Sequence, residues 1–143
     1  MARIPTHAVA NYTLTAVPPE WLLVDSGACE HIIAEGTLNT PKPEYLTRPV
    51  ILDTANGSIQ VDRCTDHLLG DIPLDKCLLT PNSTCNLMSV RKMVAKGWEY
   101  HQDKNGATLV SPQNKKYKCR EVGGLYYLDE TAATWTAKAY VSN

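Results

Sequence analysis

Short runs of hydrophobic residues, each closed by turn-forming residues, follow one another along the first half of the chain. A β-strand shows such a run when both of its faces are buried, and strict alternation when one face meets water. The segments with these patterns are residues 21–24 (WLLV), 31–34 (HIIA), 49–54 (PVILDT) and 58–62 (SIQVD). Asn56-Gly57 separates the last two and is a strong signal for a two-residue hairpin turn. The pattern predicts a short buried strand over 21–24, a further apolar run over 31–34, and a β-hairpin with an exposed tip.

Prolines and glycines predict where this β-structure is interrupted. Residues 36–49 contain three prolines and a glycine, a composition that predicts a loop because proline cannot donate to a sheet ladder. Residues 64–80 predict two further short strands, broken near Gly70 and Pro73.

One segment has the periodicity of a helix. Leu87, Val90 and Val94 share one face of the segment LMSVRKMVAK, and Gly97 follows it as a stop signal. Ser83 and Asn86, in the preceding loop, are the candidate N-caps. We expect one short helix here.

The last third of the chain is again predicted to be β-structure. Residues 98–102 and 107–110 flank a second Asn-Gly turn, and a last strand over 117–120 leads to Gly123-Gly124 and the segment LYYLD (125–129). The fold class is therefore all-β, meaning mainly β with one short α-helix. We divide the chain into an N-terminal arm (1–20), a core (21–97) and a C-terminal β extension (98–143).

Composition argues against nucleic acid or a membrane as the main partner and against an oxidising compartment. The chain has 143 residues, 43% of them hydrophobic and 20% charged, and a net charge of −1, which suits one domain without an obvious nucleic-acid or membrane surface. No run approaches the roughly 20 apolar residues of a membrane span. Five cysteines at irregular spacing favour reduced thiols in a cytosolic-type compartment over a disulfide framework.

The candidate chemistry lies where the strand over residues 21–24 ends. Asp25, Ser26 and Gly27 follow it directly, so an apolar strand presents a carboxylate beside a hydroxyl and a glycine. An aspartic protease needs this local arrangement, but it also needs two such carboxylates that share one proton. Asp53-Thr54-Ala55 is the other candidate, and its place beside the Asn56-Gly57 turn favours a flap-like hairpin instead. A twofold homodimer would supply the second carboxylate as another copy of Asp25.

Four other interpretations of these residues remain open. Ser26 as a nucleophile lacks the G-x-S-x-G elbow, and Cys29 with His31 is a conceivable thiolate dyad. Cys29, His31, Cys64 and His67 are candidate zinc ligands, although they contain one short ligand pair where a zinc site usually has two. Asp25 can also be a turn residue that caps its own loop.

Several motifs together resemble a known family. W-L-L-V-D-S-G-A-C-E-H-I (21–32), I-L-D-T-A-N-G-S-I (51–59) and C-N-L-M-S-V-R-K-M-V-A-K-G-W (85–98) are similar, in this order, to the protease region of copia-type (Pseudoviridae-like) retrotransposon polyproteins. Residues 101–110 and 122–129 resemble the stretch between protease and integrase in those polyproteins. Cys29-Glu30 departs from the small polar pair that is usual there, and residues before 21 and after 129 match no part of the family.

The resemblance implies a retropepsin-like aspartic endopeptidase, a small closed barrel with a flap hairpin that is active as a homodimer. Asp25 would be the catalytic aspartate, and Ser26, Gly27 and Ala28 would complete its loop. The flap would comprise Asp53, Thr54, Ala55, Asn56, Gly57 and Ser58. Leu87, Met88 and Ser89 would pack behind the catalytic loop.

The resemblance also implies the setting in which the protein acts. Its substrate would be the element's own capsid–polymerase polyprotein, cut in the cytoplasm within virus-like particles. No cofactor, metal, nucleic acid or membrane is expected to be required. The rival interpretation is a noncatalytic retropepsin-like module that serves dimerisation or scaffolding.

Overall fold

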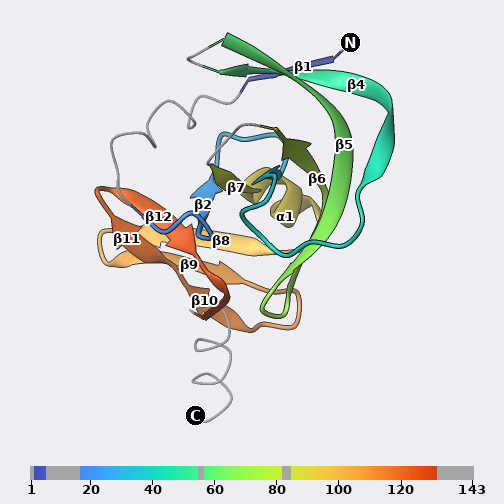
Figure 1. The fold of residues 1–143 in the computed structure, drawn as a ribbon. Coiled ribbons are helices and arrows are strands. Elements are labelled where there is room, and N and C mark those ends of the chain that lie inside the picture. Colours follow the sequence, from blue (N-terminus) through green and yellow to red (C-terminus); the bar gives the residue numbers. More distant parts are fainter. Residues whose placement is uncertain (1, 6–16, 55–56, 82–84, 132–143) are drawn as a thin grey trace.

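A computed structural model describes residues 2–5, 17–54, 57–81 and 85–131, which form twelve strands and one helix (Figure 1). The elements are β1 (Ala2–Pro5), β2 (Leu22–Asp25), β3 (Ile32–Ala34), β4 (Glu44–Thr54), β5 (Gly57–Leu69), β6 (Ile72–Thr80), β7 (Asn86–Ser89), α1 (Val90–Ala95), β8 (Glu99–Asp103), β9 (Gly106–Val110), β10 (Lys116–Lys118), β11 (Arg120–Val122) and β12 (Leu125–Leu128). The prediction of a mainly β chain with one short helix is confirmed.

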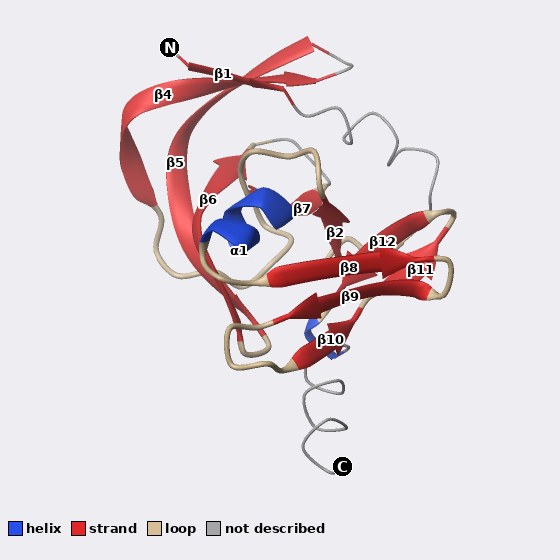
Figure 2. Cartoon of the chain, turned by 180° about the vertical axis from the view of Figure 1, so that it is seen from behind, coloured by secondary structure: helices blue, strands red, loops and turns tan. Residues whose placement is uncertain are grey.

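The strands form two sheets. Nine strands pair in the order β1-β4-β5-β6-β3-β7-β2-β12-β11, and β10-β9-β8 form a smaller sheet. Figure 2 shows the large sheet curving around α1, with β8, β9 and β10 on the far side of the helix from β1. Within the described residues the large sheet is open, with β1 and β11 as its two edges, and does not form the closed barrel that we expected.

The central strands are buried on both faces, which explains their uninterrupted apolar runs. Alternate residues of one strand enter different clusters of the core: Met88 lies in the cluster that contains Leu22 and Trp98, and Leu87 in the cluster that contains Ala28 and Leu52. The strand predicted at 21–24 and the apolar run at 31–34 are β2 and β3.

The hairpin β4–β5 is longer than the sequence predicts. Its two-residue turn is confirmed, because Thr54 pairs with Gly57. The prediction of a loop over 36–49 is wrong from residue 44 onwards, since β4 begins there and a register shift between Tyr45 and Val50 accommodates Pro49. The predicted break at Pro73 is also wrong, and β5 and β6 form one continuous hairpin around Gly70. Pro73 is tolerated because β3 pairs with β6 over residues 78–80 and not beside the proline.

The helix starts later than predicted. Residues 86–89 form β7, which pairs in parallel with β2, and Ser89 is the N-cap in place of Asn86; Ser83 lies outside the described residues. The buried residues of α1 are Val90 and Met93, whereas Val94 is 52% exposed, so the predicted helix face is wrong. Burial of β7 beside β2 outweighs the helical spacing of its side chains.

The strands beyond residue 97 complete the same core. The second hairpin is confirmed as β8–β9, and β12 pairs with β2. The single strand predicted over 117–120 is wrong: β10 pairs with β9 in the small sheet, and β11 pairs with β12 in the large one. Cys119 lies between them, and its amide donates to the carbonyl of Ala107 at 2.9 Å.

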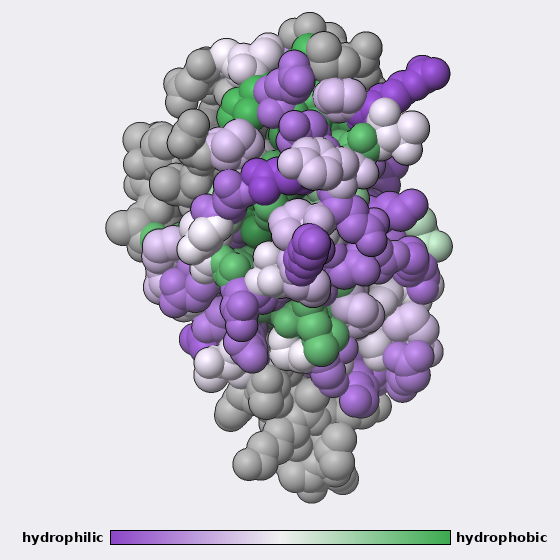
Figure 3. Space-filling model, turned by 45° about the vertical axis from the view of Figure 1, so that its right-hand side comes forward, coloured by the Kyte–Doolittle hydropathy of each residue, from purple (hydrophilic) through white to green (hydrophobic). Residues whose placement is uncertain are grey.

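The exposed hydrophobic residues are scattered. Within the residues whose side chains the structure describes, the large ones are Tyr45, Leu68 and Val94, and they lie on three different elements. Figure 3 shows one face of the molecule as mostly hydrophilic, with hydrophobic side chains in small separate groups. No helix in the described part of the chain has the length and apolar character needed to cross a membrane.

The assignment of the helix face leads to a first prediction. Met93→Ala should destabilise the protein by about 2–4 kcal/mol, because it leaves a cavity in the core. Val94→Ala should change the free energy of unfolding by less than about 0.5 kcal/mol, because this side chain is largely exposed. Urea denaturation of both variants measures the difference, and equal losses would contradict the observed helix face.

Candidate functional site

Asp25 lies at the end of β2, where the core gives way to the surface. Leu22, Leu23 and Val24 are buried, Asp25 is half-buried, and the next two residues are exposed. β7 runs parallel to β2, with Asp25 opposite Ser89. Two neighbouring strands therefore fix the backbone that presents this carboxylate.

The carboxylate of Asp25 also shapes its own loop. Its Oδ1 accepts a hydrogen bond from the amide of Gly27 at 2.8 Å, which is the turn-capping role left open by the sequence. A Cβ placed on Gly27 would lie 3.5 Å from that oxygen, an ordinary contact. Nothing in this single chain therefore requires a glycine here, and its small size leaves open space beside the carboxylate.

Ser89 ties this loop to the helix. Its side chain is fully buried, and its Oγ donates to the carbonyl of Ala28 at 2.7 Å while accepting from the amide of Lys92 at 3.1 Å. Its own amide donates to Nδ1 of His31 at 2.9 Å. One residue at the junction of β7 and α1 thus holds both ends of the segment from Ala28 to His31.

His31 is a buried, uncharged acceptor in this arrangement. It is 2% exposed, and because Nδ1 accepts from Ser89, the ring proton is assigned to Nε2. Burial lowers the pKa of His31 from 6.5 to about 4; the charge of Lys92 adds to this shift, and Asp75 opposes it. The ring therefore stays neutral at mildly acidic pH.

The first turn of α1 also contacts Cys29 and Glu30, the pair that departs from the copia-type pattern. Lys92 Nζ lies 3.4 Å from Glu30 Oε2 and donates to the carbonyl of Asp75 at 2.7 Å. Arg91 Nη1 lies 3.8 Å from Sγ of Cys29. Local sequence patterns cannot predict these contacts, because the loop and the helix are 62 residues apart in the chain.

The other chemistries suggested by the sequence find little support in these positions. Cys29 has its polar contact with Arg91, and the structure contains no hydrogen bond between it and His31. Cys64 and His67 lie on β5, and the described residues contain no group of three or more metal-ligating side chains. Ser26 is exposed in the turn after Asp25.

The predicted flap residues lie around the tip of the β4–β5 hairpin. Asp53 pairs with Ser58 across the hairpin, and the Ser58 hydroxyl donates to Asp53 Oδ1 at 2.9 Å. Thr54 and Gly57 flank the turn, whereas Ala55 and Asn56 lie outside the described residues. Leu52 of β4 belongs to the same buried cluster as Ala28, so this hairpin and the loop of Asp25 share one part of the core.

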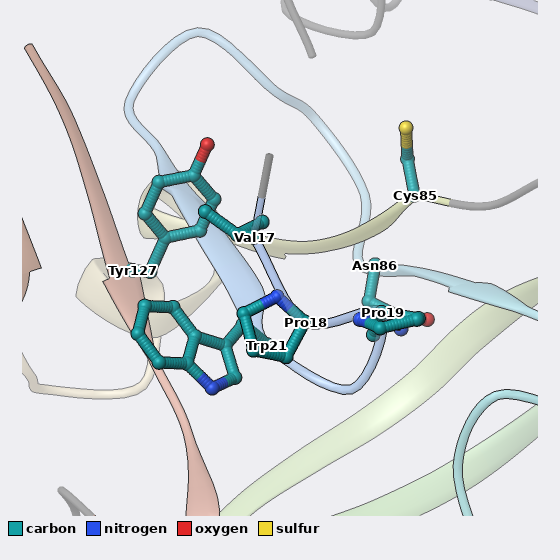
Figure 4. A pocket seen from close by; sticks show the side chains of 7 residues that line it. All are labelled: Val17, Pro18, Pro19, Trp21, Cys85, Asn86 and Tyr127. Atoms are coloured by element: carbon teal, nitrogen blue, oxygen red, sulfur yellow. The ribbon is translucent and has the colours of Figure 1, made fainter. Parts of the chain in front are cut away.

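Figure 4 shows a pocket that is not part of this site. Proline, tryptophan and tyrosine side chains line it, together with Asn86. Asn86 pairs with Leu22, at the opposite end of β2 from Asp25. Its amide group donates to the carbonyl of Pro19 and accepts from the amide of Ala34, so the residue joins the chain before β2 to the end of β3.

Comparison of the chain with models of known families, with curated proteins and with solved structures gives no match.

The environment of His31 leads to a second prediction. Its pKa is 6.5 when the chain is unfolded and about 4 when it is folded, so between these values the unfolded state binds more protons. The stabilisation is complete above pH 6.5 and is lost as pH falls towards 4, by about 3 kcal/mol for this group. His31→Asn keeps an acceptor near Nδ1 but cannot titrate, so its unfolding free energy should fall less over this range.

Denaturant unfolding from pH 4 to 7 measures the effect as the difference between the two proteins. His101→Asn is the matched control, because this histidine is exposed on β8, and its curve should follow that of the wild type. Parallel curves for the wild type and His31→Asn would contradict the role of the buried ring.

Proposed function

We propose that the chain is a retropepsin-like aspartic endopeptidase that processes a copia-type retrotransposon polyprotein, acting in the cytoplasm within virus-like particles. The observation that carries the proposal is the placement of Asp25. A strand buried on both faces ends at this carboxylate, and Ser89 fixes the loop that follows. A catalytic carboxylate needs such a rigid support, because small displacements of a reacting group are costly.

The proposed enzyme is a homodimer. A peptidase of this type needs two carboxylates that face each other across a water, whereas the hydrogen bond of the Asp25 carboxylate within the described residues comes from the amide of Gly27. Ser26 and Gly27 are exposed beside it, which leaves the approach open to a second copy. In this arrangement each chain contributes one Asp25, and the hairpin β4–β5 of each chain serves as a flap over the substrate.

The proposed reaction is general acid–base hydrolysis. One Asp25 carboxylate takes a proton from the water, whose oxygen attacks the scissile carbonyl, while Asp25 of the partner subunit, protonated, donates to the carbonyl oxygen. The tetrahedral species then collapses, the C–N bond breaks, and a proton passes to the leaving amine. Because the reaction needs one of the two carboxylates protonated and the other ionised, activity should be highest at mildly acidic pH. His31 remains neutral there, which keeps the Ser89 contact intact.

A third prediction tests the assignment of Asp25. Asp25→Asn should abolish self-cleavage of a precursor that carries flanking polyprotein sequence, and the variant should keep the fold, because an amide oxygen can still accept from Gly27. Asp103→Asn is the matched control: Asp103 also accepts a hydrogen bond from the amide two residues on, at 2.7 Å, but it lies exposed in the β8–β9 hairpin, so its variant should cleave within a few-fold of the wild type. Gel analysis of the precursor at pH 5–6 measures both.

Three outcomes would contradict parts of the proposal. Cleavage by Asp25→Asn would exclude Asp25 as the catalytic group, and equal loss in Asp103→Asn would show that the loss is not specific to Asp25. A wild-type dimer in sedimentation experiments that cleaves neither precursor nor peptide, and does not bind a pepsin-type transition-state inhibitor, would favour the noncatalytic module. The Asp25–Gly27 hydrogen bond would then be a purely structural turn.

A further inference from the structure

The N-terminal strand β1 lies along the hairpin that we propose as a flap. It pairs in parallel with β4, with Ala2 opposite Val50 and Pro5 opposite Asp53. Figure 1 shows it near the top of the sheet, along β4. The chain itself thus places an extended segment on the outer edge of β4, close to the hairpin turn.

The side chain of Leu52 on β4 lies in the same part of the core as the loop that we propose as catalytic. Leu52, opposite Ile4 in the pairing, is 1% exposed and belongs to the buried cluster that contains Ala28. A segment paired with residues 50–53 therefore lies on the strand that packs towards the loop of Asp25. An extended peptide that adds to a sheet edge uses the same main-chain groups as β1 does.

We propose that the β4 edge over residues 50–53 is a binding site for an extended peptide, and that β1 is its intramolecular occupant, in competition with substrate. The inference rests on the proposed function for the identity of the competitor, a polyprotein segment. It adds that the first residues of the chain restrain the flap until a substrate strand takes their place.

The geometry of β1 suits an exchangeable occupant. It has four residues, and parallel pairing is slightly less stable per residue than antiparallel pairing. A few backbone hydrogen bonds hold it, and each contributes modestly to stability. Since pairing within one chain acts at an effective concentration of about millimolar, a free peptide at micromolar concentration should compete poorly until β1 is weakened.

Pro5 indicates which amides of β1 face β4. Proline in an edge strand places its missing N–H towards solvent, and successive residues point their N–H groups to opposite sides. The amide of Arg3 should therefore face outward with that of Pro5, and the amide of Ile4 should face β4. A proline at position 4 removes a ladder donor, whereas a proline at position 3 removes an outward one.

The test uses the full chain with either Ile4→Pro or Arg3→Pro, and a synthetic peptide of residues 1–6 (MARIPT) as the probe. Peptide affinity is measured by titration, and amide hydrogen exchange is followed at Val50 to Asp53. Ile4→Pro should bind the peptide about tenfold more tightly than the wild type, and alternate amides of the β4 edge should exchange faster without peptide. Arg3→Pro should match the wild type in both measurements.

Equal peptide affinity in all three proteins, no binding in any of them, or unchanged exchange in Ile4→Pro would overturn the proposal. The binding measurement does not depend on catalysis. Competition at the β4 edge in a protein that never cleaves a precursor would refute the proposed function and leave the peptide site standing. A protein that cleaves its precursor but gives the same peptide affinity in all three forms would refute the peptide site and leave the proposed function in place. Thermal unfolding of both proline variants should show that each keeps the core.

Discussion

The parallel pairing of β2 with β7 is the interaction on which the rest of this structure depends. It places Asp25 opposite Ser89, and Ser89 is both the last residue of a buried strand and the N-cap of α1. A parallel pair has to be covered on both faces, and here one face packs towards α1 and the small sheet while the other packs towards the β4–β5 hairpin. The position of the candidate carboxylate is therefore fixed by most of the core, including residues far beyond it in the chain.

Buried polar groups at this junction are paired with one another. The Ser89 hydroxyl donates to the Ala28 carbonyl and accepts from the Lys92 amide, and the Ser89 amide donates to His31. These hydrogen bonds attach the loop of Asp25 to the helix without any buried charge. Such a network holds one geometry as long as every member keeps its partner. Protonation of His31 would replace its acceptor nitrogen with a donor facing the Ser89 amide. The low pKa of this ring is thus part of what keeps the loop in place under the acidic conditions that a carboxylate pair requires.

Sequence patterns predict those parts of the fold that neighbouring residues in the chain determine by themselves. The buried strand before Asp25 and the two Asn-Gly hairpins were predicted correctly, because a continuous apolar run or a two-residue turn leaves few alternatives. The apolar spacing of residues 87–89 suits either a helix or a strand, so the sequence predicts a helix there, and only pairing with a distant strand decides between the two. Pro49 and Pro73 suggest interruptions of the strands. A register shift in β4 accommodates Pro49, and Pro73 lies in the part of β6 that does not pair with β3. For the candidate site, the sequence indicated Asp25, whereas the partnership of Ser89 with His31 depends on two segments that meet only in the folded chain.

The candidate site has two parts, the loop of Asp25 and the edge of β4, and they differ in what the chain itself supplies. The loop of Asp25 is held at both ends by its own chain, yet it presents one carboxylate where the proposed chemistry needs two. The β4 edge, in contrast, already carries a strand, and that strand comes from the same chain. In the proposed dimer a second copy would supply the missing carboxylate, whereas a substrate would reach the β4 edge by displacing β1. Association and substrate entry would then be separate events with separate free-energy costs. Because Leu52 and Ala28 share one buried cluster, the exchange of strands at the β4 edge would take place on the strand that covers the loop of Asp25.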